Sequence, residues 1–137
     1  MHTRSSSSDV RRLLAGAVGI GALLAGCGQD HQALDRAAAQ FEAAVAGGDG
    51  TAGCALLAAA TREALEHRTG TPCPSTLPGL HLPGGDVVQV AQWGREGQVR
   101  TSADTLFLTM TDQGWRVAAA GCSPRGEAPY ACTVEGP

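Results

Sequence analysis

The chain after residue 30 begins with the periodicity of an α-helix. Apolar side chains recur every three to four positions between about His31 and Ala46, so they line one helix face. The run Gly47-Gly48-Asp49-Gly50 is expected to end this helix and turn the chain. A second pattern of the same period extends from Ala52 to about His67. The sequence therefore predicts two helices, whose buried faces are formed by Leu34, Ala38, Phe41 and Val45 and by Leu57, Thr61, Ala64 and Leu65.

Residues 70–85 interrupt this periodicity. Four of them are proline and several are glycine, so the segment is predicted to be irregular. It is either a mobile flap or a linker, and the sequence leaves both interpretations open.

The last third of the chain has the alternation of β-strands instead. Between Asp104 and Thr111, Leu and Met side chains alternate with Thr and Phe, as on the two faces of a strand. The following Asp112-Gln113-Gly114 is expected to form a hairpin turn. Strands are predicted at residues 86–93, 98–101, 104–111 and 115–121. Because the helices come first and a meander of strands follows, the expected fold class is α+β, with the N-terminal helices packed on one face of an antiparallel sheet.

The first 26 residues have the three regions of an export signal. A polar start leads to Arg11-Arg12, an apolar stretch runs from Leu13 to Ala25, and Leu24-Ala25-Gly26-Cys27 follows. The apolar stretch is shorter than the roughly 20 residues needed to cross a bilayer, which is typical of a cleaved leader. We expect a signal peptide at residues 1–26, a short tether at 27–31 and one domain at 32–137. Arg11-Arg12 leaves the twin-arginine export route open beside the general secretory route.

The end of this leader resembles a lipobox, the site read by the enzymes that process bacterial lipoproteins. The resemblance implies that the thiol of Cys27 receives a diacylglyceryl group and that cleavage occurs between Gly26 and Cys27. Two acyl chains on one residue give stable anchoring, where a single chain is marginal. The expected location is therefore the cell membrane, with the lipid-anchored domain on its extracytoplasmic face.

Charge makes some partners unsuitable. The full chain carries a net charge of −3, and the part after residue 26 has seven Arg against twelve Asp and Glu, a net charge of −5. Nucleic-acid binding depends on Lys and Arg contacts to phosphate, so no nucleic acid is expected as a partner. Electrostatic docking on anionic lipid headgroups is disfavoured for the same reason.

Four cysteines remain after Cys27, an even number that indicates disulfides in a small exported domain. We favour the pairs Cys54–Cys73 and Cys122–Cys132, because each pair brackets a short segment. In the chain-entropy model each bond contributes about 3 kcal/mol. Zinc is the alternative, but no Cys-x-x-Cys or His-x-x-x-His spacing occurs, so no metal site is expected.

Several motifs resemble a group of small lipoproteins from high-G+C Gram-positive bacteria. They are Asp104-Thr-Leu-Phe-Leu, Gly114-Trp115-Arg-Val-Ala-Ala-Ala-Gly-Cys122, Pro129-Tyr130-Ala-Cys132 and Cys54-Ala-Leu-Leu with Ala60-Thr61-Arg62. This group resembles part of the nuclear transport factor 2-like superfamily. Over roughly residues 32–136, the resemblance implies a cone in which N-terminal helices close over a curved antiparallel sheet. The superfamily shares a shape without sharing a function, so the match predicts fold and location only.

Enzymes of that superfamily use an Asp base with a Tyr or a protonated Asp inside the cone. The one tyrosine here, Tyr130, follows the last predicted strand. Asp86 and Asp104 begin predicted strands, where a turn position accounts for each. No pair of histidines has ligand spacing, and no phosphate loop or cofactor motif occurs. We therefore expect no catalytic residue and no cofactor.

A modest, mostly apolar cavity is the remaining candidate site. Its expected function is that of a non-catalytic binding or interaction domain, with an unknown extracytoplasmic protein or a small apolar ligand as partner. The alternative is a small isomerase- or hydratase-like enzyme that uses the cone cavity. The aromatic residues among the candidates also suit an ordinary core. The candidate lining residues are Phe41, Val88, Trp93, Phe107 and Val117.

Overall fold

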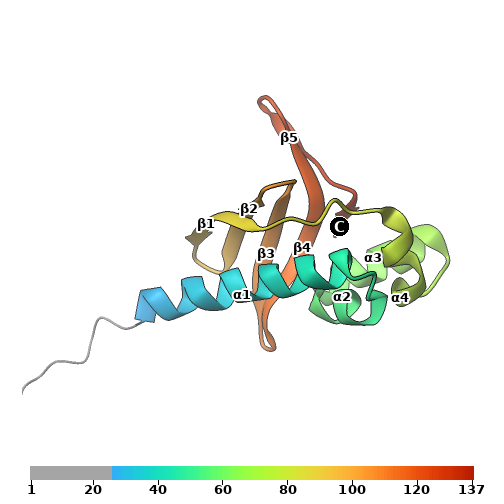
Figure 1. The fold of residues 1–137 in the computed structure, drawn as a ribbon, viewed down its shortest axis with the longest axis horizontal. Helices are drawn as coiled ribbons and strands as arrows, with labels where there is room; N and C mark the ends of the chain where they lie inside the picture. Colours follow the sequence, from blue (N-terminus) through green and yellow to red (C-terminus); the bar gives the residue numbers. More distant parts are fainter. Residues whose placement is uncertain (1–25) are drawn as a thin grey trace, which may run out of the picture.

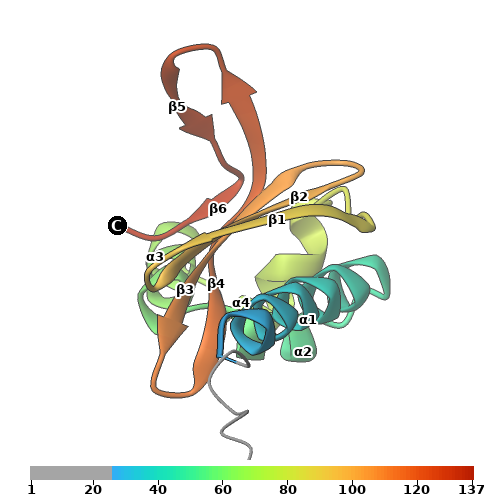
Figure 2. The same ribbon diagram turned by 90° about the vertical axis from the view of Figure 1, so that its left-hand side faces the viewer.

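The computed structural model describes residues 26–137, so residues 1–25 of the expected leader lie outside it. The described chain has the predicted α+β architecture, with the helices against one face of an antiparallel sheet (Figures 1 and 2). The helical elements are α1 (Gly26–Ala46), α2 (Gly50–Leu56), α3 (Ala59–Thr69), α4 (Cys73–Thr76) and the 3-10 helix η1 (Leu77–Leu80). The strands are β1 (Val87–Trp93), β2 (Glu96–Thr101), β3 (Thr105–Thr111), β4 (Gly114–Arg125), β5 (Ala128–Ala131) and β6 (Val134–Glu135).

Helix α1 lies along the sheet and buries the predicted face. Leu34, Ala38 and Phe41 are fully buried, and Val45 is half-buried. The helix begins at Gly26 rather than near His31, so residues 27–31, which were expected to form a tether, are helical. Amphipathic periodicity locates the packed part of a helix, and the first turns of α1 extend beyond that part.

The prediction of one helix from Ala52 to His67 is wrong. The chain leaves the helical path at residues 57–58, where Leu57 forms a parallel bridge with Val117 of β4. The Ala58 N–H donates to the Val117 carbonyl at 2.8 Å. Before the break, the Asp49 side chain caps α2 by accepting from the Ala52 N–H at 2.9 Å. Pairing with a strand distant in sequence therefore overrides the helical period.

Residues 70–85 are more regular than predicted, because they contain α4 and η1. Cys73, the first residue of α4, is bonded to Cys54 of α2, as predicted. The Glu66 carboxylate accepts from the Cys73 N–H at 2.8 Å, which joins α3 to the same cluster. Leu77 of η1 is buried in the core. The disulfide thus links α2 to α4, and the Glu66 hydrogen bond adds α3 to the same end of the molecule.

The sheet has the strand order β1-β2-β3-β4-β5, with β6 also paired to β4. Strand β4 continues past Gly121, and its far half pairs with β5 to form an arm that projects away from the helices (Figure 2). The predicted disulfide Cys122–Cys132 closes the base of this arm. Tyr130 lies within β5, so the expectation that it follows the last strand is wrong. Short strands of this kind have too few alternating positions to be predicted.

The core lies between the helices and the sheet. The sheet contributes alternate residues of β2, β3 and β4, and helix α1 packs so closely on β2 that Leu34 covers Gly97. The residues that the sheet contributes to this core cluster are Val99, Leu106, Leu108, Trp115, Val117, Ala120 and Val134.

Candidate functional site

The five residues expected to line a cavity do not come together. Phe41 and Val117 are fully buried in the core between α1 and the sheet. Val88 and Trp93 of β1 are 57% and 54% exposed. Phe107 alternates with the buried Leu residues of β3, so it lies on the opposite face of the sheet. The cavity prediction was wrong because the sequence shows which strand positions alternate but not which face a helix covers.

On that opposite face, the arm partly covers the sheet. The rings of Phe107 and Tyr130 meet edge to face, with their centroids 5.1 Å apart. The Gln98 side-chain amide donates to the Tyr130 hydroxyl at 3.2 Å. A hollow of about 110 Å³ lies beside them, which is small for a ligand site. This cluster therefore fastens the arm to the sheet.

A larger cleft of about 630 Å³ lies between α1 and residues 84–87. Glu42 of α1 lines this cleft, although the residue as a whole is only 5% exposed. The Gly85 N–H donates to the Glu42 carboxylate, which fixes the loop before β1 against α1. Asp35 and Asp86 lie at the cleft surface, and Ser102 lines it from the loop after β2.

The pKa of Glu42 is raised from 4.5 to about 7. Burial is the main cause, because it removes water from the charged form, and the negative charge of Asp104 adds to the effect. The hydrogen bond from Gly85 opposes the rise. Glu42 therefore exchanges its proton near neutral pH.

Asp104 itself is held by the backbone around it. The Thr101 hydroxyl donates to one carboxylate oxygen at 2.7 Å, and the Gly121 N–H donates to the other at 2.9 Å. These bonds tie the turn between β2 and β3 to the bend in β4. Asp86 is exposed, and its N–H donates to the Ser102 hydroxyl at 3.2 Å. Asp104 thus lies close enough to Glu42 to raise the pKa of that carboxyl group, whereas Tyr130 lies on β5 in the arm.

Sequence reasoning missed Glu42, although a signal was present. The residue stands four positions after Ala38 and next to Phe41, on the stripe that α1 buries. A carboxylic acid on such a stripe must be neutralised or hydrogen-bonded when it is buried. The position of Glu42 in the helical period was therefore enough to single it out.

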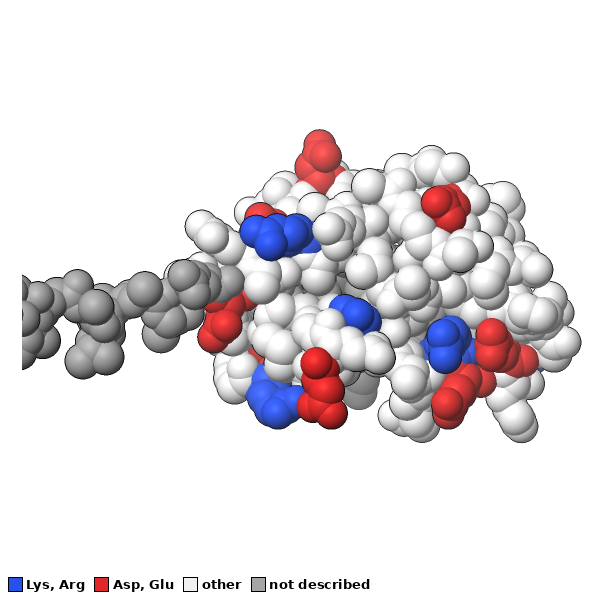
Figure 3. Space-filling view, turned by 90° about the horizontal axis from the view of Figure 1, so that it is seen from below, with Lys and Arg blue, Asp and Glu red and all other residues white. Residues whose placement is uncertain are grey.

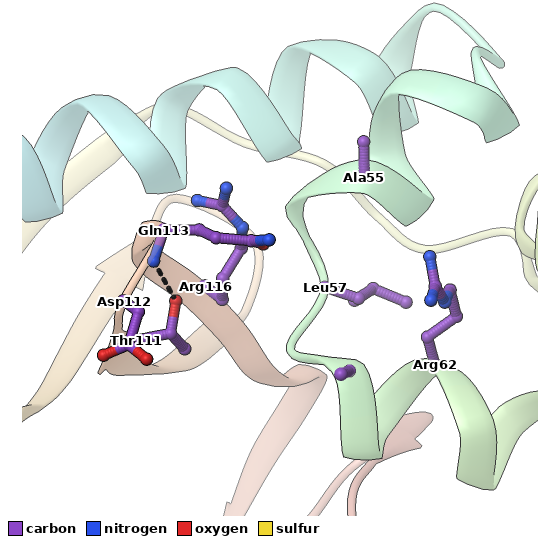
Figure 4. A pocket seen from close by; sticks show the side chains of 8 residues that line it. Ala55, Leu57, Arg62, Thr111, Asp112, Gln113 and Arg116 are labelled. Carbon is purple, nitrogen blue, oxygen red and sulfur yellow. Dashed lines mark hydrogen bonds between the residues drawn. The ribbon is translucent and has the colours of Figure 1, made fainter.

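A third hollow, of about 310 Å³, lies between the β3–β4 hairpin and helices α2 and α3 (Figure 4). Arg62 and Arg116 both line it, but in Figure 4 they lie on opposite sides of Leu57. The guanidinium of Arg116 donates to the Trp115 carbonyl at 2.9 Å. The two cations do not converge on one point, so this hollow is not a built anion site.

No protein-family model, curated protein or solved structure matches this chain. Its function therefore has to be inferred from its own residues.

Within residues 26–137 no helix is long and apolar enough to cross a membrane. The same residues contain no group of three or more His, Cys, Asp or Glu side chains placed to hold a metal ion. On the face seen in Figure 3, acidic and basic side chains are dispersed among neutral ones. The two disulfides indicate an oxidising, extracytoplasmic environment.

Proposed function

We propose that the chain is an exported lipoprotein, held to the membrane by a lipid on Cys27, whose α+β domain is a non-catalytic binding or interaction domain. The observation that carries this proposal is the pair of disulfides, because such bonds persist outside the cytoplasm. The lipobox-like Leu24-Ala25-Gly26-Cys27 adds the means of attachment. We also propose the nuclear transport factor 2-like cone as the fold family, which the one-sided packing of helices on the antiparallel sheet supports.

The geometry favours a protein partner over a small apolar ligand. The cleft of about 630 Å³ beside α1 is open, and three carboxyl groups line it, those of Asp35, Glu42 and Asp86. An apolar ligand would leave such groups poorly hydrated, whereas a protein surface can hydrogen-bond to them.

Replacing Cys27 tests the proposed anchor. In Cys27→Ala the thiol that accepts the lipid is gone, so the protein is expected to stay unprocessed or to appear in the medium. Cell fractionation with detection of the domain measures this, together with the mass of the mature N-terminal peptide. Cys54→Ala/Cys73→Ala is the matched control, because it removes other cysteines and should leave the anchor intact.

The proposal is overturned if Cys27→Ala is still cleaved and stays with the membrane fraction in high salt. High salt is needed because it releases proteins held only by surface charge.

Glu42 favours a second candidate function, a small isomerase- or hydratase-like enzyme. A carboxyl group that ionises near neutral pH beside a cleft is suited to act as a general base. The test is uptake of deuterium from heavy water, next to the carbonyl group, by a panel of small ketones. Exchange that is abolished in Glu42→Gln supports this candidate. Absence of exchange with the wild-type protein, or equal exchange with the variant, removes it.

A further inference from the structure

Trp93 is an exposed aromatic residue at the end of strand β1. Its side chain is 54% exposed, whereas the other tryptophan, Trp115, is 3% exposed in the core. A single exposed indole is common on protein surfaces, so its exposure alone assigns it no role, and its place in the fold has to carry the argument. Trp93 is followed by the turn Gly94–Arg95, whose Arg95 guanidinium donates to the Met110 carbonyl at 2.8 Å. The indole is thus displayed on a hydrogen-bonded hairpin.

Helix α1 and strand β1 lie side by side and run in opposite directions. Glu42 contacts Gly85 at one end of this pair. Towards the other end, His31 lines a shallow hollow together with Val90. Following α1 back to its N-terminus therefore leads in the direction of Trp93. Figure 1 shows the N-terminus of α1 and the end of β1 at the same, left-hand end of the molecule.

The distances along the two elements agree with this view. From His31 back to Cys27 the helix rises about 6 Å, at about 1.5 Å per residue. From Val90 to Trp93 the strand advances about 10 Å, at about 3.3 Å per residue. The backbones of Cys27 and Trp93 therefore lie at similar levels along the long axis. No flexible linker separates them, because α1 is helical from Gly26 onward.

We propose that Trp93 and the β1–β2 turn rest in the headgroup layer of the membrane that holds the lipid on Cys27. This inference rests on the proposed function, since the lipid brings this end of the domain to the bilayer. Trp suits the interface because its ring is apolar and its N–H hydrogen-bonds to water or headgroups. One indole is too small to retain the protein on the membrane. Its effect is to orient the domain, with α1 pointing away from the bilayer.

The experiment follows tryptophan fluorescence in the lipidated protein. Wild type and Trp93→Phe are reconstituted into phosphatidylcholine–phosphatidylglycerol vesicles whose acyl chains carry bromine near the headgroups. Mass spectrometry of the N-terminal peptide first establishes whether Cys27 carries the diacylglyceryl group. Trp93→Phe is the matched control, because its emission comes from the buried Trp115 alone.

We expect the brominated lipid to remove about half of the wild-type emission, since one of two tryptophans lies in the interface, and to leave Trp93→Phe nearly unchanged. The inference is overturned if lipidated wild type is quenched no more than Trp93→Phe while aqueous iodide still quenches Trp93. In that case the anchor stands and the indole faces water or another protein. An unmodified Cys27 overturns both the proposed function and the inference.

Discussion

The residue with the most unusual environment is Glu42, since its carboxyl group is buried on the packed face of α1 near a second carboxyl, that of Asp104. The two carboxyl groups have different hydrogen-bond partners. Asp104 receives hydrogen bonds on both oxygens, whereas Glu42 receives one from the Gly85 N–H and faces the cleft. Repulsion between two negative charges is relieved when Glu42 takes up a proton.

This arrangement predicts that stability falls as the pH rises. The pKa of Glu42 is about 7 in the folded protein and about 4.5 when the carboxyl is fully hydrated, as in the unfolded chain, so the folded state holds its proton more tightly. The stability that the protonated Glu42 carboxyl group contributes is fully present below about pH 4.5. It is lost as the pH rises from there to about 7. Glu42→Gln keeps an acceptor for the Gly85 N–H without the charge. The free energy of unfolding of this variant should therefore change less with pH over this range. Above about pH 7 the variant should be more stable by on the order of 1–3 kcal/mol.

Urea unfolding across this pH range measures the effect. Asp35→Asn is the matched control, because it removes the same charge from an exposed position on the same helix. Parallel pH profiles for wild type and Glu42→Gln would contradict the role assigned to Glu42.

At the scale of elements, helix α1 packs closely on strand β2 at Gly97. A Cβ atom built there would lie 2.6 Å from Leu34 Cδ2, well inside van der Waals contact. Gly97→Ala should therefore displace the fully buried Leu34 side chain and lower the free energy of unfolding by roughly 1–3 kcal/mol. Gly79→Ala in η1 meets no atom within 4 Å and serves as the control. Thermal unfolding of both variants measures the difference, and equal melting temperatures would contradict this packing.

The elements also show which parts of the fold a sequence can reveal. Helix α1 and the β3–β4 hairpin were predictable because their period persists over several turns or pairs. The break at Leu57 was not, because the bond from Ala58 to Val117 joins residues far apart in the chain. Both disulfides were predictable because each pair of cysteines brackets a short segment. The exposure of Val88 and Trp93 depends on how α1 lies across the sheet, so no local pattern predicts it.

At the scale of the whole molecule, the elements are divided between two ends and one face of the sheet. The short helices α2, α3 and α4 and the Cys54–Cys73 bond lie at one end, the N-terminus of α1 and the β1–β2 turn lie at the other, and the arm projects from the open face of the sheet (Figures 1 and 2). The candidate site could be predicted only in part: a charged residue on a buried stripe was visible at Glu42, but the loop that closes over it was not.

The continuity of α1 with Cys27 has a consequence for how far the domain can reach. A domain joined to its membrane anchor by a long flexible linker samples a large volume above the bilayer, and the linker length sets its effective concentration near a partner. Here the helix that begins beside the proposed anchor is itself part of the packed domain. At about 1.5 Å per residue, its 21 residues place the α2–α4 end about 30 Å from Cys27. With the helix upright on the bilayer, as we propose, the surface of the α2–α4 end stays within a narrow range of heights above the lipid, instead of sweeping a wide volume.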